Sequence, residues 1–203
     1  MRYANKNQYE GEWKNDKKHG RGVLVYSDGS KYDGEWKFDD KDGTGTLIYA
    51  DGSRYEGEWR HDKRHGYGTC NYADGTYYEG EWRFDDQTGE GTMQYSDKSR
   101  YEGEFKNNKK HGKGTYNYPD GTIYEGEWKY NDRDGVGTCY YPDKSKYLGE
   151  WKNNKRDRRG IMNYPDGSSY EGEWKSDCKD GEGIFTTADG IVIAGVWRND
   201  QQI

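Results

Sequence analysis

The chain has 203 residues, of which only 29% are hydrophobic, 34% are charged and 16% are aromatic, and its formal net charge is −6. This balance argues against nucleic acid as a main partner, because phosphate binding requires a concentrated basic surface. It also argues against simple disorder, since disordered chains are poor in aromatic residues, whereas this chain has 21 Tyr and 8 Trp.

The number and spacing of the cysteines favour a reducing compartment, and the hydropathy argues against a membrane-spanning helix. Three cysteines without paired spacing do not make a disulfide framework. No apolar run approaches the ~20 residues of a membrane-spanning helix, and no signal peptide is visible. We therefore expect a cytoplasmic location.

From residue 9 onward the chain repeats one motif. The stretch YEGEWKNDKKHGRG at residues 9–22 returns with small changes, and its ring-bearing position recurs every 23 residues without an insertion. A fixed short period predicts an array in which each unit buries its apolar face on its neighbours. The whole chain, 1–203, is predicted to be one array of about nine repeats, with rings at Trp13, Trp36, Trp59, Trp82, Phe105, Trp128, Trp151, Trp174 and Trp197.

Within a unit, two strands are expected. In YEGEWK, at 9–14, Tyr, Gly and Trp alternate with charged residues, which is typical of a half-buried strand. The second strand follows within 20–26, where Gly20, Gly22, Leu24 and Tyr26 share one face. NDKKH is expected to join the two strands, and SDGS to join one hairpin to the next, because Asp-Gly favours a turn.

This pattern predicts an all-β fold, an elongated single-layer antiparallel β-meander of consecutive 23-residue hairpins with one aromatic face. Lys98 and Lys144 replace the turn glycine in two repeats. A left-handed backbone at those positions would cost about 1 kcal/mol or more.

These residues resemble the MORN repeat, whose pattern of YEGEW, a following GxG and a YxDGSxY turn extends over essentially the whole chain. Phe105, Arg158 and Thr187 are local departures. The resemblance implies a non-enzymatic scaffold, and an all-repeat chain is similar to the stand-alone cytoskeletal MORN proteins of protozoan parasites, near the cell cortex. Because Tyr3 to Tyr9 aligns with the turn at Tyr95 to Tyr101, we expect a fragment of a longer array.

The aromatic face is the first candidate for partner binding. A groove for cytoskeletal proteins is predicted along the rings of the central repeats, Tyr55, Trp59, Tyr78, Trp82, Tyr101, Phe105, Tyr124 and Trp128. The hairpin tips of successive repeats are alternately basic and acidic, which gives the array a second period, a superperiod of 46 residues. It indicates either matching of neighbouring charges or a regular docking strip for a repeating partner.

The C-terminal end is apolar on both strand faces. Ala194 and Val196 replace outward glutamates, and Ile184 replaces an outward Thr. A last strand with an unpaired edge and two apolar faces favours a tail-to-tail homodimer. The alternative is a terminal repeat that is packed by the chain's own curl or by residues missing from this fragment. The predicted interface is Ile184, Phe185, Ile191, Ile193, Ala194, Val196 and Trp197.

Catalysis and cofactors have little support in the sequence. A repeat multiplies the same residues, whereas an active site needs a unique set, so no catalytic residue is predicted. Cys178, with neighbouring carboxylates, is one incomplete candidate for a structural zinc site. The rival functions are phospholipid binding, for example of a phosphoinositide, or service as an accessory module of a catalytic protein.

Overall fold

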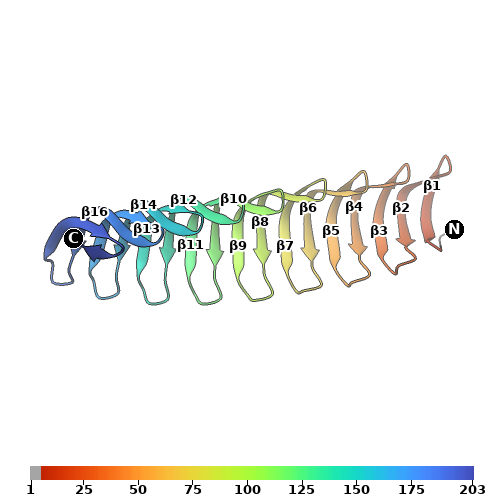
Figure 1. Ribbon diagram of the computed structural model, residues 1–203. Helices are drawn as coiled ribbons and strands as arrows, with labels where there is room; N and C mark the ends of the chain where they lie inside the picture. Colours follow the sequence, from red (N-terminus) through yellow and green to blue (C-terminus); the bar gives the residue numbers. More distant parts are fainter. Residues whose placement is uncertain (1–5) are drawn as a thin grey trace. The chain divides into compact units, whose positions relative to one another are not determined.

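The computed structural model describes residues 6–203, and its strands are antiparallel and belong to an open sheet. From Gln8 to Gln94, and again from Lys109 to Gln202, each strand pairs with the next along the chain. No helix occurs among these residues. The expected all-β meander of hairpins is therefore confirmed (Figure 1).

The strands divide between two compact units. The first unit comprises residues up to Ser96 together with Phe105–Asn108, and the second comprises Asp97–Glu104 and Lys109–Ile203. The first contains β1 (Gln8–Lys14), β2 (Lys17–Val25), β3 (Lys31–Lys37), β4 (Asp40–Ile48), β5 (Arg54–Arg60), β6 (Lys63–Asn71), β7 (Tyr77–Arg83) and β8 (Asp86–Gln94). Strand β9 (Arg100–Lys106) is divided between the units, and the second contains β10 (Lys109–Asn117), β11 (Ile123–Lys129), β12 (Asp132–Tyr140), β13 (Lys146–Lys152), β14 (Lys155–Asn163), β15 (Ser169–Lys175), β16 (Cys178–Thr186), β17 (Val192–Arg198) and β18 (Gln201–Gln202).

The hairpin tips are shorter than the sequence suggested. Only Asn15 and Asp16 separate β1 from β2, so most of NDKKH lies inside strands. Both residues have positive φ, 51° and 59°, as a two-residue type I′ turn requires. The turns between hairpins follow the prediction, and Lys98 and Lys144 are left-handed, with φ of 72° and 74°.

A bulge bends the second strand of the hairpins β1–β2, β3–β4, β5–β6, β7–β8, β11–β12, β13–β14 and β15–β16. Between the pairs Gly34↔Gly45 and Trp36↔Lys41, β3 has one residue and β4 has three. Such an excess bends the strand and increases its twist. The bend explains how a single sheet layer can bury rings, since it turns the end of each strand toward its own aromatic face.

Neighbouring hairpins are joined through the second tip residue. Asp39 accepts a hydrogen bond from the backbone N–H of Lys18 at 2.9 Å, and the Asp39 N–H donates to the Lys18 carbonyl at 3.0 Å. The same reciprocal pair recurs at Asp62, Asp85, Asn108, Asn131, Asn154, Asp177 and Asp200. Asp and Asn supply the same acceptor oxygen, which explains why these positions hold only these two residue types.

Candidate functional site

The ring face is a closed core rather than an open groove. All eight rings predicted to bind a partner, Tyr55, Trp59, Tyr78, Trp82, Tyr101, Phe105, Tyr124 and Trp128, are 4% exposed or less. They therefore offer almost no free surface in this structure. The prediction that they line a groove is corrected, because the bent strands enclose them.

Edge-to-face packing holds these rings. Tyr55 lies between Trp59 of its own repeat and Trp82 of the next, with centroids 5.0 and 5.4 Å away and ring planes nearly perpendicular. The Trp82 indole donates to the Gly68 carbonyl at 3.1 Å, and the Arg64 guanidinium lies 4.2 Å above the same indole. The Trp82 indole thus has its N–H paired and its face covered by a cation.

Glycine makes this packing possible. A Cβ at Gly68 would lie 2.4 Å from the Tyr55 hydroxyl oxygen. The ring therefore occupies the space that any side chain would need. The opposite face of the sheet is left with a bare strip of backbone at the paired glycines.

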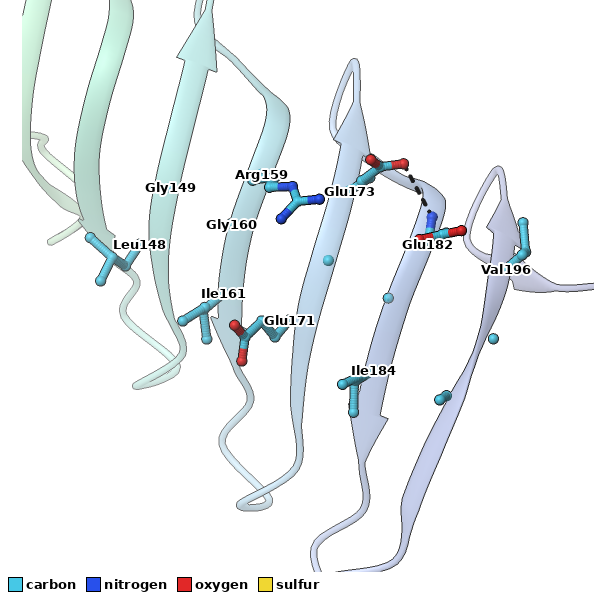
Figure 2. A pocket seen from close by; sticks show the side chains of 14 residues that line it. Leu148, Gly149, Arg159, Gly160, Ile161, Glu171, Glu173, Glu182, Ile184 and Val196 are labelled. Carbon is cyan, nitrogen blue, oxygen red and sulfur yellow. Dashed lines mark hydrogen bonds between the residues drawn. The ribbon is translucent and has the colours of Figure 1, made fainter.

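On that opposite face, the second unit has an apolar groove across β13–β17 of about 840 Å³. Figure 2 shows one wall with Leu148, Ile161, Glu171 and Ile184, and the other wall with Arg159, Glu173, Glu182 and Val196. The floor is formed by paired glycines. The full lining is Leu148, Gly149, Arg159, Gly160, Ile161, Glu171, Gly172, Glu173, Glu182, Gly183, Ile184, Ala194, Gly195 and Val196.

The predicted dimer residues fall on both faces of the sheet. Ile184, Ala194 and Val196 line the groove, and Ile184 and Val196 are 44% and 43% exposed. Phe185, Ile193 and Trp197 alternate with them and face the ring side. Trp197 is buried and belongs to the core, whereas Ile191 lies exposed in the turn before β17.

The edge of β17 is only partly open. The sequence had suggested that β17 is the last strand. In the structure the short strand β18 follows it and pairs with it at Trp197↔Gln202 and Arg198↔Gln201. Within the described residues, Val192–Gly195 pairs only with β16. The open edge and the groove therefore lie at the same end of the second unit.

Sequence reasoning missed the charged wall of this groove. Period-two alternation places the second glutamate of YEGEW on the face away from the rings and predicts no partner for it. In the structure it accepts a backbone hydrogen bond across the bulge, as Glu173 does from the Glu182 N–H at 3.1 Å. At repeat seven Arg158 replaces a glycine, and its guanidinium binds Glu150 at 3.1 Å. The bulge decides these contacts, and period-two alternation gives no sign of it.

The 46-residue superperiod corresponds to a specific contact at the tips. His19 packs on Phe38 with ring centroids 5.2 Å apart, and His65 packs on Phe84 at 4.8 Å. His111 and Tyr130 repeat the contact in the second unit. The aromatic tip of each of these even-numbered repeats therefore covers the histidine of the repeat before it.

Cys178 stands at the start of β16 and is partly exposed. Desolvation raises the pKa of its thiol above the ordinary value, and the carboxylates of Asp200 and Asp177 raise it further. A raised pKa disfavours the thiolate that zinc requires. Among residues 6–203 no three His, Cys, Asp or Glu side chains cluster as metal ligands, so Cys178 has no complete ligand set within one chain. No helix in the same range is long and apolar enough to cross a membrane.

Comparison with known proteins agrees with the repeat period. The MORN repeat model matches eight consecutive segments, residues 9–31, 32–54, 55–77, 78–100, 101–123, 124–146, 147–169 and 170–192. The ninth repeat stays a prediction. Comparison with curated proteins gave no match.

One solved structure with a TM-score above 0.5 shows a related fold. The TCP10 domain of Danio rerio CPAP is 12% identical, with a TM-score of 0.53, and the match covers 100% of this chain and 94% of that one. The TCP domain of Drosophila melanogaster SAS-4, solved with a proline-rich motif of Ana2, is 14% identical, with a TM-score of 0.49 over 86% of this chain and 94% of that one. At 12% identity the likeness to the CPAP domain concerns the fold alone. The eight matched segments, together with the phase of their rings and glycines, show that the chain belongs to the MORN-repeat family.

Proposed function

We propose that this chain is a non-enzymatic scaffold that pairs through its C-terminal repeats and organises cytoskeletal or cell-cortex assemblies by protein–protein contacts. MORN repeats suggest a protein-interaction or membrane-associated module. The observation that carries the proposal is the exposed apolar groove across β13–β17. The proposed location is the cytoplasm, as in a stand-alone cytoskeletal MORN protein.

The groove is unusual for so polar a chain. The mean hydropathy is −1.51, yet Leu148, Ile184 and Val196 each stand more than 40% exposed on one face. Covering them removes apolar surface from water at about 25 cal/mol per Å². A twofold axis is a natural way to do so, because a self-complementary patch then meets its own copy.

Charge and backbone support the same pairing. Arg159 and Glu182 lie on the same wall of the groove, so two copies related by a twofold can oppose unlike charges. The open stretch of β17 offers unpaired backbone groups beside them. Because the rings of the core are already buried in each chain, the groove and this edge are surfaces that remain open for association.

The absence of catalysis is part of the proposal. The titratable side chains of the array recur from repeat to repeat, and a unique constellation is what an active site requires. The charged residues of the groove are one arginine, Arg159, and three glutamates, of which Glu173 accepts a hydrogen bond from a backbone N–H. This arrangement fits recognition of another protein.

Light scattering coupled to size exclusion tests the pairing. We expect the 203-residue chain to run as a dimer at micromolar concentration and the double variant Ile184→Glu/Val196→Glu to run as a monomer. Ile48→Glu is the matched control, because Ile48 is equally exposed, 42%, on a strand of the first unit. A monomeric wild-type chain at 100 µM, or a double variant that stays dimeric, would refute tail-to-tail pairing.

The membrane-tethering alternative predicts different behaviour. Three glutamates, Glu171, Glu173 and Glu182, surround the groove and would repel anionic headgroups. Sedimentation with phosphoinositide vesicles that is lost in high salt would favour lipid binding over protein scaffolding. The third possibility, an accessory module for a catalytic protein, is decided by whether such a partner requires the groove for its activity.

A further inference from the structure

A strip of paired glycines crosses the first unit from β1 to β8. Gly11 pairs with Gly22, Gly22 with Gly34, and Gly34 with Gly45, and the series continues through Gly57, Gly68, Gly80 and Gly91. On the ring side, a tyrosine ring occupies the space that a side chain at each of these glycines would need. On the other face glycine projects nothing, so the strip forms the floor of a furrow that runs across the strands.

An open hollow lies over this floor. It measures about 540 Å³ across β2–β5 and is lined by Arg21, Asp33, Gly34, Thr44, Gly45, Thr46, Glu56 and Gly57. The residues on either side of each glycine form its two walls, because neighbours of a strand residue point to the opposite face. The backbone of a ligand can approach the floor closely, since no side chain stands on it.

The walls alternate in chemistry with a period of two strands. The odd strands β1, β3, β5 and β7 place an acid on both sides of the glycine, as Glu10/Glu12, Asp33/Glu35, Glu56/Glu58 and Glu79/Glu81. Of the strands between them, β4, β6 and β8 place Thr on one wall, at Thr46, Thr69 and Thr92, and β2 has Val23 there. Their opposite wall positions are mixed, and the single acid among them is Glu90 of β8. Arg21 is the basic residue in the walls of β1–β8, and Lys31 and Arg54 reach Asp33 and Glu56 from outside at 3.9 and 2.5 Å.

Several of these carboxylates are held in place by the backbone. One oxygen of Glu12 accepts from the Arg21 N–H at 2.9 Å, and one oxygen of Glu58 accepts from the Tyr67 N–H at 2.9 Å. Glu81 is held in the same way by the Glu90 N–H at 3.2 Å. Because a carboxylate has two acceptor oxygens, the second oxygen is positioned to meet a cation without further loss of side-chain freedom.

The spacing selects one backbone conformation for a ligand lying in the furrow. Strands are about 4.8 Å apart, so the acidic pairs recur about every 9.6 Å. A polyproline II helix advances about 3.1 Å per residue and returns to the same side every third residue, or about 9.3 Å. An extended β-strand presents one side every two residues, about 6.7 Å, which does not match.

We propose that the furrow over β1–β8 binds a polypeptide segment in the polyproline II conformation that carries Lys or Arg at every third residue. The segment crosses the strands with its basic side facing the acidic pairs. This surface is separate from the apolar groove of the second unit, and its ligand is independent of the pairing proposed above. The acidic walls exclude nucleic acid and anionic lipid by the same charge that attracts the peptide.

Fluorescence anisotropy of a labelled (Pro-Pro-Lys)5 peptide, titrated with the full 203-residue chain, measures the binding. Two further probes separate spacing from charge. One has the same composition with the lysines irregularly placed, and the other is (Pro-Pro-Glu)5. We expect saturable binding of the regular lysine peptide, binding about five- to tenfold weaker for the irregular one, and none for the glutamate peptide.

A wall variant and a matched control locate the site. Asp33→Asn/Glu56→Gln/Glu79→Gln removes three charges from one wall, and Asp16→Asn/Asp40→Asn/Asp42→Asn removes three charges from the hairpin tips. We expect the wall variant to weaken binding at least about fivefold and the tip variant to leave it within about twofold. Circular dichroism checks that both variants fold, and the comparison of peptides on the wild-type chain stands even if one does not.

The outcomes are decisive in both directions. Equal affinity for regular and irregular lysine peptides would reduce the effect to net charge and overturn the proposal. Equal weakening by the wall and tip variants, or no saturable binding at 50 mM salt, would overturn it as well. Loss of dimerisation in the test above would leave this result unaffected, so the two proposals fail separately.

Discussion

Gly45→Ala tests the physical basis of the whole array. Gly45 does not have a positive φ, so an added methyl group brings no backbone strain of its own. Its Cβ would lie 2.3 Å from the Tyr32 hydroxyl oxygen and 2.5 Å from the ring carbon that bears it. The ring must therefore leave its position.

The expected loss follows from what holds Tyr32. Its ring makes two edge-to-face contacts, with Trp36 at 5.0 Å and Trp59 at 5.4 Å, and its hydroxyl donates to the Glu35 carbonyl at 3.0 Å. Two such ring contacts at about 0.5–1.5 kcal/mol each and one hydrogen bond of similar size give roughly 1.5–4.5 kcal/mol.

Urea unfolding, followed by circular dichroism and by tryptophan fluorescence, measures this loss, provided that the two transitions coincide. Gly45→Ala is measured in two backgrounds, the natural chain and the Tyr32→Ile variant. Isoleucine has a precedent at this position, since Ile193 occupies it in the last repeat. In the Tyr32→Ile background the methyl group meets no ring, and Gly45→Ala should cost less than about 1 kcal/mol, which gives a coupling of about 1–3 kcal/mol. An equal cost in both backgrounds would refute the ring-over-glycine explanation.

Three further changes have defined outcomes. Asp39→Ala should destabilise the chain by about 1–3 kcal/mol because it leaves a backbone N–H of the preceding hairpin unpaired, whereas Asp39→Asn should be nearly neutral in the same urea assay; equal effects would contradict the shared-acceptor explanation. Lys98→Gly should stabilise by about 1 kcal/mol by removing a left-handed side-chain conformation, and an unchanged urea midpoint would contradict this. Burial raises the pKa of Tyr26 and of Tyr170 from about 10 to about 12, with nearby acidic and phenolic groups adding to the effect. Because the folded state then holds its phenolic protons more tightly than the unfolded state, this stability is complete below pH 10 and is lost between pH 10 and 12. Thermal unfolding across that range checks it, and a flat midpoint would count against buried phenols.

The sequence alone determined the fold class and the phase of its repeats. Period-two alternation in YEGEWK and the unbroken spacing of 23 residues identify hairpin strands and the face that bears Tyr32 and Trp36. The Asp-Gly turns were also readable, because positive φ is a local demand that few residues meet. These features depend on neighbours within one repeat.

Only the tertiary structure decided which face is available to a partner. The bulge between Gly34 and Trp36 bends each hairpin over its own rings, and the cation of one repeat covers the indole of the next, as Lys18 does at 4.1 Å from Trp36. The rings that looked like a binding surface are therefore core. The glycines beneath them leave the opposite face open to a ligand. Contacts between residues about 20 positions apart depend on the register of the strands and on the bend at the bulge. The alternation of hydrophobic residues in the sequence predicts neither of these.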